Sequence, residues 1–433
     1  MAARYLKQAP PSQPEAETRV RDAVAAIIAD VQERGEAAVR DASERFDRWS
    51  PESFRLTSDE IDACIASLPA ELVDDIQFAQ RQVRAFAQAQ LESMHEFEIE
   101  TMPGVFLGQR HLPIENVGAY VPGGRYPLLA SAHMTALTAK VAGCDRVAAC
   151  TPPDRGRIPA ASVAAMSIAG ADEIYVLGGV QAIAAMAIGT ESMAPVSFIA
   201  GPGNAYVAEA KRQLFGRIGI DLIAGPTEIL VIADDDADPF VVAVDLLGQA
   251  EHGPDSPAVL VTTSRHVAEQ AMREIEALLP GMPTRANAEP AWRDHGEVIL
   301  VDDLDEAFEV ADAYASEHVE VLTRDPRDAL KKMRSFGALF LGDRTCVPYG
   351  DKVIGTNHVL PTRGAARYTG GLWVGKFLRT VTYQEVREDA ASARIGEACG
   401  RLCRAENFEG HARSADIRAV GFDRARLDWP NLA

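Results

Sequence analysis

The stretch that decides the fold is residues 146–189, RVAACTPPDRGRIPAASVAAMSIAGADEIYVLGGVQAIAAMAIG. Two short β-branched runs, RVAAC and IYVL, are each followed by a turn and an alanine-rich segment of helical character. The pattern continues outward with VSFIAGPG before NAYVAEAKRQLFG, and then with EILVIAD. Strand, glycine turn and helix in repetition predict a parallel sheet with crossover helices.

A second set of the same kind follows the acidic run DDDADP at 234–239. PAVLVTT, EVILV, VEVLT and ALFLG alternate there with segments of helical periodicity. We therefore expect an α/β fold with two Rossmann-like parallel-sheet αβα domains, a short N-terminal arm and a small helical C-terminal segment. The expected bounds are 1–20 for the arm, 21–112 with 234–372 for a discontinuous αβ domain 1, 113–233 for αβ domain 2, and 373–433 for the C-terminal segment.

Composition narrows the class of protein. The 433 residues are 47% hydrophobic and 24% charged, and the formal net charge is −20. Such an acidic chain is unsuited to sequence-independent binding of nucleic acid, and no apolar stretch is long enough to cross a membrane. The N-terminus lacks the apolar core of a signal peptide, and the six cysteines do not suggest a disulfide framework. We expect a cytoplasmic protein that handles a small-molecule substrate.

Three glycine turns follow predicted strands, at PGG (122–124), LGG (177–179) and GPGN (201–204). Each precedes a helix, whose N-terminal amides can hold a phosphate or carboxylate. None matches the dinucleotide fingerprint GxGxxG, and tight turns alone would also require glycine. Three such turns in one domain favour a ligand at the carboxyl edge of the sheet.

Polar side chains gather in QAEHGPDS (249–256), SEH (316–318), GDKVIGTNHVLPT (350–362) and ENFEGHA (406–412). Taken singly, each histidine is more often structural than a ligand. Taken together, these histidines and the Gln, Asp and Glu beside them can supply one divalent metal site and one acid–base pair. Gln249 and His252 are three residues apart, so both lie on one side of a helix end.

QAEHGPDS, SEH, GTNHVLPT, GPGNAYV and VGAYVPGG occur in an order that resembles the histidinol dehydrogenase family, and the resemblance runs from residue 21 to about 418. It implies oxidation of a primary alcohol through the aldehyde to the carboxylate, with reduction of two NAD. It also implies zinc as cofactor and an intertwined homodimer with shared active sites. Manganese or cobalt remains an alternative metal.

The resemblance assigns roles by motif. It implies Glu317 and His318 as the catalytic acid–base pair. It implies zinc ligands at Gln249, His252, Asp351 and His411. It implies NAD contacts at Tyr120, Gln181 and Asn204. It implies substrate contacts at Thr227, His358 and Glu406, besides the metal ligands and His318. His411 and Glu406 would serve the partner's site.

Some segments depart from the biosynthetic enzymes. GPTE places Thr227 where they usually carry serine, PGGRYPLLASAHM brings Arg125 close to the site, and ARYTGGLWVGKFLRT is longer than their equivalent. These segments resemble the sulfopropanediol dehydrogenase branch, which oxidises 2,3-dihydroxypropane-1-sulfonate to sulfolactate. Arg125 would suit an anionic head group, although an NAD phosphate or a surface acid is an equal alternative. Oxidation of L-histidinol to L-histidine and a catalytically inactive zinc-binding paralogue are the other two hypotheses.

Overall fold

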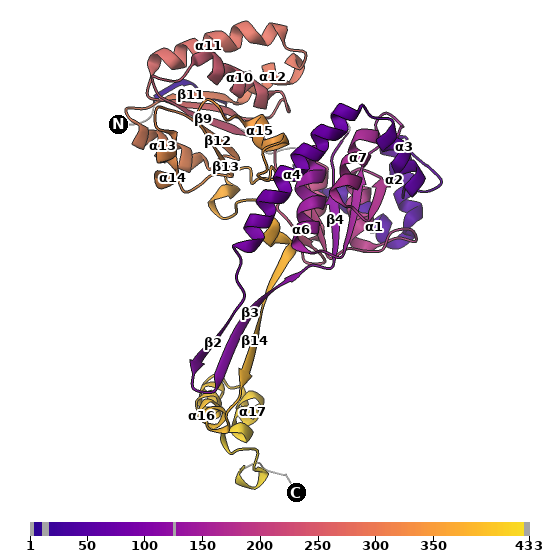
Figure 1. Cartoon of the computed structure of the whole chain (residues 1–433), viewed down its shortest axis with the longest axis vertical. Helices are drawn as coiled ribbons and strands as arrows, with labels where there is room; N and C mark the ends of the chain where they lie inside the picture. Colours follow the sequence, from indigo (N-terminus) through magenta and orange to yellow (C-terminus); the bar gives the residue numbers. More distant parts are fainter. Residues whose placement is uncertain (1–3, 11–16, 124–126, 428–433) are drawn as a thin grey trace. The chain divides into compact units, whose positions relative to one another are not determined.

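The computed structural model describes residues 4–10, 17–123 and 127–427 (Figure 1). Its contacts divide the chain into two compact units. Unit 1 comprises residues 1–91 and 114–377, and unit 2 comprises residues 92–113 and 378–433. Unit 1 holds a five-stranded and a six-stranded sheet, and unit 2 holds a three-stranded sheet.

The five-stranded sheet is parallel, in the order β6-β5-β4-β7-β8. Its strands are β4 (Asn116–Tyr120), β5 (Arg146–Thr151), β6 (Glu173–Val176), β7 (Phe198–Ala200) and β8 (Gly219–Ile220). The chain enters at β4, continues to β5 and β6 on one side, and returns to β7 and β8 on the other side. A topological switch point therefore lies between the carboxyl ends of β4 and β7, which is where open α/β sheets bind ligands.

Helices connect these strands as the sequence predicts. They are α5 (Ala130–Ala132), the π-helical turn η1 (His133–Leu137), α6 (Thr138–Ala142), α7 (Ala160–Ala169), α8 (Gly179–Ile188) and α9 (Ala205–Leu214). Most residues of α7 and α8 are buried. Their alanine-rich, nearly uncharged sequences suit helices that are covered on most sides.

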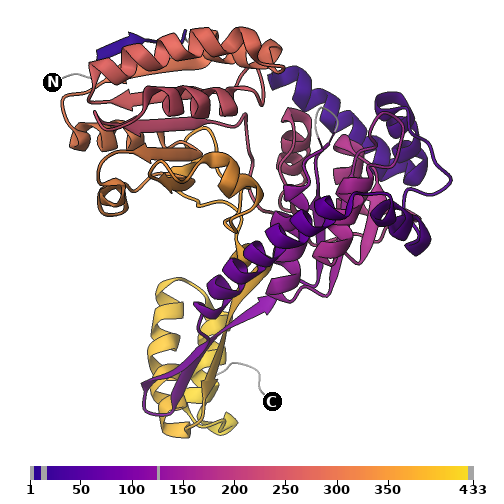
Figure 2. The ribbon, with the colours of Figure 1, turned by 45° about the horizontal axis from the view of Figure 1, so that its top comes forward.

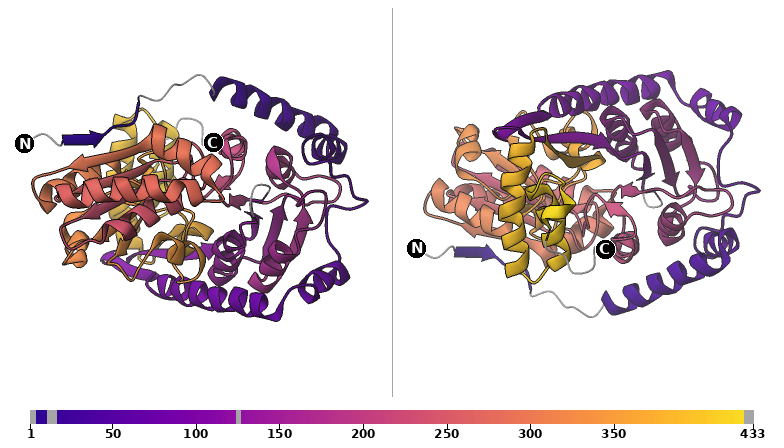
Figure 3. Two further views of the ribbon diagram at one scale, coloured as in Figure 1. Left: turned by 90° about the horizontal axis from the view of Figure 1, so that it is seen from above. Right: turned by 90° about the horizontal axis from the view of Figure 1, so that it is seen from below.

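The N-terminal helices pack on this five-stranded sheet. They are α1 (Glu17–Arg34), α2 (Glu36–Asp47), α3 (Ser58–Ala66) and α4 (Ala70–Glu92). α1 contacts α8 and α9, α2 contacts α8, and α3 contacts α7. α1 and α4 lie on opposite sides of the sheet (Figure 3). The sequence predicts that residues 21–112 share a domain with 234–372; in the structure these helices bury their apolar faces against the helices of the 113–233 segment, within the unit that also contains 234–372.

The six-stranded sheet has the order β1-β11-β10-β9-β12-β13. Its strands are β1 (Arg4–Lys7), β9 (Ile229–Ala233), β10 (Ala258–Thr262), β11 (Gly296–Leu300), β12 (His318–Leu322) and β13 (Ala338–Leu341). All are parallel except β1, which lies antiparallel to β11, so the predicted arm adds a strand to this sheet. The domain boundary predicted at residue 233 is wrong for β9, which pairs with β10 and β12 in the middle of this sheet.

Helices cover both faces of the six-stranded sheet (Figure 2). One face packs against α10 (Pro239–Ala250), α11 (Arg265–Leu278) and α12 (Arg285–His295). The other face packs against α13 (Leu304–Tyr314) and α14 (Ala329–Lys332). Leu322 packs in the core between the sheet and α10, α11 and α12, whereas Val319 and Val321 pack in the core on the α13 and α14 side. Alternate residues of β12 therefore point to α10. The short helix α15 (Val347–Lys352) follows β13.

Unit 2 combines an antiparallel sheet with a helical hairpin. β14 (Leu378–Val386) pairs with β3 (Val105–Pro113), and β3 pairs with β2 (Phe97–Met102). α16 (Asp389–Ala405) packs closely on α17 (Glu409–Ala419), since a Cβ at Gly396 would lie 2.7 Å from the Ala415 carbonyl oxygen. The segment expected to be helical from residue 373 therefore begins with a strand, β14, and β2 is a strand that the sequence analysis did not predict.

Among the residues that the structure describes, none of the helices combines the length and apolarity that a bilayer-spanning helix needs.

Candidate active site

Glu317 and His318 lie at the amino edge of the six-stranded sheet. His318 begins β12 opposite Ile229, the first residue of β9. Thr227 and Glu228 immediately precede β9, and parallel neighbours start at the same edge, so these two pairs of residues meet. Glu317 Oε2 accepts hydrogen bonds from Thr227 Oγ1 at 2.5 Å and from the Glu228 amide at 3.0 Å. The sheet therefore holds the Glu317 carboxylate in one orientation.

The hydrogen bonds of His318 determine which ring nitrogen is available. Nδ1 lies 2.9 Å from the Glu228 carbonyl oxygen, which can only accept, so Nδ1 carries the proton in the neutral ring. Nε2 is buried without a hydrogen-bond partner among the described residues, 3.4 Å from Asp351 Oδ1. A buried lone pair with no donor attached is what a general base requires.

Burial and charge shift both pKa values. Burial raises the pKa of Glu317 to about 7, against the opposing effects of His318 and the Thr227 hydroxyl. Burial lowers the pKa of His318, but the charges of Glu317 and Asp351 outweigh it and raise the value to about 9. At neutral pH the imidazolium must therefore lose a proton before Nε2 can accept one. Although burial alone would raise it, His318 lowers the pKa of Asp351 to about 2. These three groups form one electrostatic cluster.

The motif QAEH brings two more side chains to this edge. α10 is antiparallel to the strands it connects, so it ends beside the start of β10. Gln249 in its last turn is buried, donates from Nε2 to Thr227 Oγ1, and has Nε2 3.3 Å from His318 Nδ1. His252 follows the helix; partial burial of its ring lowers its pKa, and the Asp351 charge opposes this. Gln249 and Asp351 therefore lie beside His318, and His252 is near enough for the Asp351 charge to affect its pKa.

Gln249, His252 and Asp351 have side chains of the kinds that bind zinc, but three ligands are one fewer than a tetrahedral zinc site needs. An imidazole, a carboxylate and an amide oxygen are all ligands for a borderline divalent ion. Within the described ranges, however, no three His, Cys, Asp or Glu side chains are grouped closely enough to hold a metal. The fourth predicted ligand, His411, lies in α17 of unit 2 against Phe408, with ring centroids 5.3 Å apart. Glu406 caps the end of α16 in the same unit.

His358 joins the two sheets of unit 1. Its Nδ1 lies 2.8 Å from the Asp351 carbonyl oxygen and its Nε2 lies 3.2 Å from Ser131 Oγ in α5. The neighbouring Asn357 donates to the Met134 carbonyl at 2.9 Å. Both contacts fall on the helix interrupted by η1, and π-helical turns often occur at functional sites. The sequence motif pointed to His358, but nothing in it indicated Ser131.

The residues predicted to contact NAD lie at the carboxyl edge of the five-stranded sheet. Tyr120 ends β4, and its hydroxyl accepts a hydrogen bond from the Gly179 amide at 3.0 Å. Gln181 is buried in the first turn of α8 and donates to Asp47 Oδ2 at 2.9 Å. Asn204 caps α9 by accepting from the amides of Tyr206 and Val207. Their grouping agrees with a ligand at the switch point. Arg125 lies outside the described residues.

Sequence reasoning missed a buried carboxyl pair behind the site. Glu320 is fully buried on the α10-facing side of β12, two residues after His318, and neither of its oxygens has a hydrogen-bond partner within the described part of the chain. Burial, and then the charge of Asp245 on α10, raise the pKa of Glu320 to about 9. Burial also raises the pKa of Asp245 to about 6. A Glu at the centre of a strand whose neighbours are all apolar is the signal that would have identified it.

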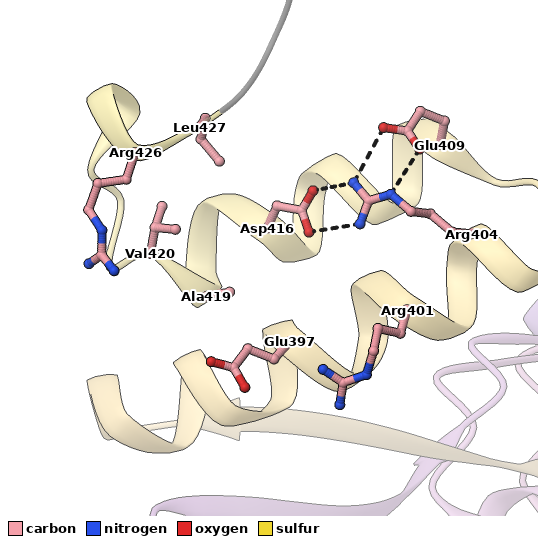
Figure 4. Close-up of a pocket in the computed structure, with 9 residues that line it drawn as sticks. All are labelled: Glu397, Arg401, Arg404, Glu409, Asp416, Ala419, Val420, Arg426 and Leu427. Carbon is pink, nitrogen blue, oxygen red and sulfur yellow. Dashed lines mark hydrogen bonds and ion pairs between the residues drawn. The ribbon is translucent and has the colours of Figure 1, made fainter.

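A cavity of about 480 Å³ lies in unit 2 beside α16 and α17 (Figure 4). Arg404 points across it, and Glu409 and Asp416 both bind its guanidinium. The positive charge at its centre is therefore already neutralised, and no chemistry is assigned to this cavity.

Comparison with known proteins supplies the family. The histidinol dehydrogenase family model matches residues 11–419. A histidinol dehydrogenase homologue of Shouchella clausii is 57% identical over 98% of this chain and 100% of its own length. A sulfopropanediol 3-dehydrogenase of Ruegeria pomeroyi is 46% identical over 98% of this chain and 97% of its own. The crystal structure of histidinol dehydrogenase from Elizabethkingia anophelis superposes with a TM-score of 0.89, at 34% identity, and covers 96% of this chain and 95% of that chain. The chain therefore belongs to the histidinol dehydrogenase family of oxidoreductases.

Proposed function

We propose that the protein is a zinc-dependent enzyme that oxidises a small polar primary alcohol through the aldehyde to the carboxylate with two NAD. The observation that carries the proposal is the buried His318 imidazole. Its Nδ1 lies 2.9 Å from the Glu228 carbonyl oxygen and 3.4 Å from Glu317 Oε2, and its Nε2 lies 3.4 Å from Asp351 Oδ1. A base and a carboxylate in contact are the two groups that sequential oxidation of an alcohol requires.

In the first oxidation, His318 Nε2 accepts the hydroxyl proton of the substrate while a hydride leaves the same carbon. NAD, when bound, supplies the hydride acceptor for both oxidations. In the second oxidation, Glu317 removes a proton from the water that adds to the aldehyde carbonyl, and His318 returns its proton to the carbonyl oxygen to complete the hydrate. His318 then accepts a proton from the hydrate as the second hydride leaves. One water is consumed and two NAD are reduced for each alcohol.

The neighbours of Glu317 prepare it for this role. Thr227 and the Glu228 amide hold one carboxylate oxygen, and a pKa of about 7 leaves a large ionised fraction at neutral pH. Gln249 in turn donates to Thr227, so the hydroxyl can donate only to Glu317. This chain of donors fixes the direction of the carboxylate without neutralising it.

The proposed zinc site takes its ligands from two subunits of the homodimer. Gln249, His252 and Asp351 of unit 1 would hold zinc together with His411 of the partner subunit, in a homodimer with shared active sites. The zinc would bind the polar groups of the alcohol and so orient it toward His318. Glu406 of the partner subunit and His358 would contact the substrate. The fit rests on donor chemistry and on the closeness of Gln249 and Asp351 to His318.

Tyr120, Gln181 and Asn204 would hold NAD at the carboxyl edge of the five-stranded sheet. Thr227 and Asp351 belong to the other sheet of unit 1, and His358 links the two sheets through Ser131. The substrate would therefore lie between the nucleotide edge of one sheet and the acid–base edge of the other.

For the substrate we propose 2,3-dihydroxypropane-1-sulfonate, with sulfolactate as product. The support is the similarity to the sulfopropanediol 3-dehydrogenase of Ruegeria pomeroyi, which extends over 98% of this chain. The threonine at 227 and the arginine at 125 are the sequence features consistent with this branch. Arg125 would bind the sulfonate oxygens through its paired N–H donors.

Formation of NADH by zinc-loaded protein tests the proposal, with the sulfonate and L-histidinol supplied separately. Turnover of the sulfonate alone supports it. Turnover of histidinol alone would replace the proposed substrate but keep the mechanism. Absence of NADH with either alcohol and with a wider panel of small polar alcohols would refute the activity and favour a zinc-binding protein without catalysis.

A further inference from the structure

The main chain of Glu228 contacts both members of the proposed acid–base pair. Its amide donates to Glu317 Oε2 at 3.0 Å, and its carbonyl oxygen lies 2.9 Å from His318 Nδ1. The donor belongs to the peptide bond before Glu228, and the acceptor belongs to the peptide bond after it. A displacement of this one residue would therefore turn the side chains of Glu317 and His318 together.

The side chain of Glu228 is directed at a different part of the chain. It is 9% exposed, and its Oε1 accepts a hydrogen bond from the Arg363 amide. Burial raises the pKa of Glu228, and the amides of Arg363 and Glu317 and the charge of His318 oppose this. Because main-chain donors occupy the carboxylate, it is not available as a third acid–base group.

A second hydrogen bond joins the same two segments. Residues 225–228, the entry segment, precede β9, and residues 359–363, the supporting loop, follow α15. Thr362 Oγ1 accepts a hydrogen bond from the Gly225 amide at 2.6 Å. A Cβ at Gly225 would lie 2.5 Å from Arg363 Nε and 2.9 Å from Arg363 Cδ, so the two segments are in close contact. The entry segment is therefore bonded to the supporting loop at both of its ends.

The supporting loop has anchors of its own. The Leu372 amide donates to the Val359 carbonyl oxygen at 2.8 Å, and the Val359 amide donates to Asn357 Oδ1 at 3.0 Å. The side chains of Val359 and Leu360 are buried. The loop is therefore a fixed support against which the entry segment is held.

We propose that Glu228 is a positioning residue, whose carboxylate fixes the entry segment to the supporting loop and so orients Glu317 and His318 for the reaction. The inference rests on the proposed function, because it takes these two side chains as the acid–base pair. A general base must lie within hydrogen-bond reach of the proton that it removes, and a small displacement lowers turnover strongly. The Glu228 carboxylate acts through the main chain of its own residue and not on the substrate.

Replacement of the Glu228 side chain separates positioning from substrate binding. Glu228→Ala leaves the Arg363 amide without its acceptor, so kcat should fall about ten-fold or more while KM stays within about two-fold of the wild-type value. Glu228→Gln keeps an oxygen that can accept from this amide, so it should retain most of the wild-type kcat. Steady-state NADH formation with the alcohol that the wild type oxidises measures both constants.

Thr362 supplies a second variant, which acts at the other end of the entry segment. Thr362→Val should lower kcat as Glu228→Ala does, and Thr362→Ser should restore it, because serine keeps the hydroxyl. Glu297→Ala is the matched control, since Glu297 lies in β11 of the same sheet and its carboxylate also accepts from a main-chain amide, that of Ala9 at 3.1 Å. The control should leave kcat and KM unchanged when all variants are assayed well below their melting temperatures.

Hydrogen exchange of the substrate-free protein tests the same contact without catalysis. The main-chain amides of residues 225–229 and 316–318 should exchange faster in Glu228→Ala than in the wild type, and Glu228→Gln should exchange like the wild type.

The outcomes separate the inference from the proposed function. If the wild type oxidises an alcohol and Glu228→Ala keeps its kcat or changes only KM, the positioning role is wrong and the function stands. An equal loss of kcat in Glu228→Gln would also overturn the role, because that variant keeps the acceptor. If the wild type oxidises no alcohol, the function is wrong; unchanged exchange in Glu228→Ala would then overturn the inference too, whereas faster exchange would support the contact on which it rests.

Discussion

Replacing Glu320 by glutamine should change how stability depends on pH. The folded protein holds the pKa of Glu320 at about 9, whereas the ordinary value is 4.5. Between these two values the folded state keeps a proton that the unfolded chain has lost. The unfolded state binds fewer protons, so the free energy of unfolding falls as pH rises through this window.

The size of the effect follows from the number of protons involved. One proton retained on folding gives a slope of about −1.4 kcal/mol per pH unit. Asp245 titrates in the folded state at about 6, so above that pH only Glu320 of this pair contributes. The glutamine side chain of the Glu320→Gln variant cannot ionise. Between pH 6.5 and about two pH units above it, the free energy of unfolding of this variant should therefore rise by roughly 2–3 kcal/mol relative to that of the wild type.

Urea unfolding of both proteins at several pH values between about 6.5 and 8.5 measures this difference directly. Asp245→Asn is the second variant: loss of the neighbouring charge lowers the pKa of Glu320 and should narrow the window of falling stability. Parallel stability curves for the wild type and Glu320→Gln would refute the reasoning, because they would show that Glu320 ionises normally in the folded state.

Three further predictions concern the site and its support. Thr227→Val should lower kcat about ten-fold or more, because Glu317 loses a donor and Gln249 an acceptor; Thr227→Ser should restore most of it, and equal steady-state rates in all three proteins would contradict the role of the hydroxyl. Oxidation of added aldehyde should accelerate as pH rises through about 7, since Glu317 acts as a base only when ionised; a pH–rate profile unchanged by Glu317→Gln would exclude it. Lys211→Met should cost about 3–5 kcal/mol of stability in urea unfolding, because it leaves the buried Asp221 carboxylate without its cation; a loss below about 1 kcal/mol would show that the pair is dispensable.

The order of strands and helices from residue 146 onward could be predicted because each segment carries its own periodicity. The placement of β9 could not, since the same apolar run satisfies the edge of one parallel sheet or the middle of another. The acidic run that follows Ala233 suggested a boundary there. β9 belongs to the six-stranded sheet because it pairs with both β10 and β12, and these strands lie far along the chain from the segment that precedes β9.

β2 and β14 escaped prediction for a different reason. The β2 sequence FEIETM does alternate apolar and polar residues, but the strand is short and follows closely on the long helical pattern of α4. Most residues of β2 and β14 are exposed, so neither strand carries a buried face. Their stability in unit 2 comes from continuous pairing with β3. The helical character of the segment after β14 was predicted, because the sequence of α16 is amphipathic; the pairing of α16 with α17 was not.

The sequence identified some residues of the candidate active site and missed others. Motifs identified Glu317, His318, Gln249 and Asp351, which the fold brings together within unit 1. The hydrogen bond between Thr227 and Glu317 could not be predicted, because it exists only where β9 and β12 begin side by side. Glu320 looked like the exposed member of a strand, but β12 lies between β9 and β13 and is covered on both faces.

The central claim is that His318 performs the chemistry while the metal is held by other residues. The measurement that tests it is the zinc content of purified His318→Asn and His411→Asn proteins, determined together with NADH formation. We expect His318→Asn to retain the zinc of the wild type but to lose turnover about 10²-fold or more, whereas His411→Asn should lose zinc. Full turnover in His318→Asn, or loss of its zinc with retention in His411→Asn, would contradict the account.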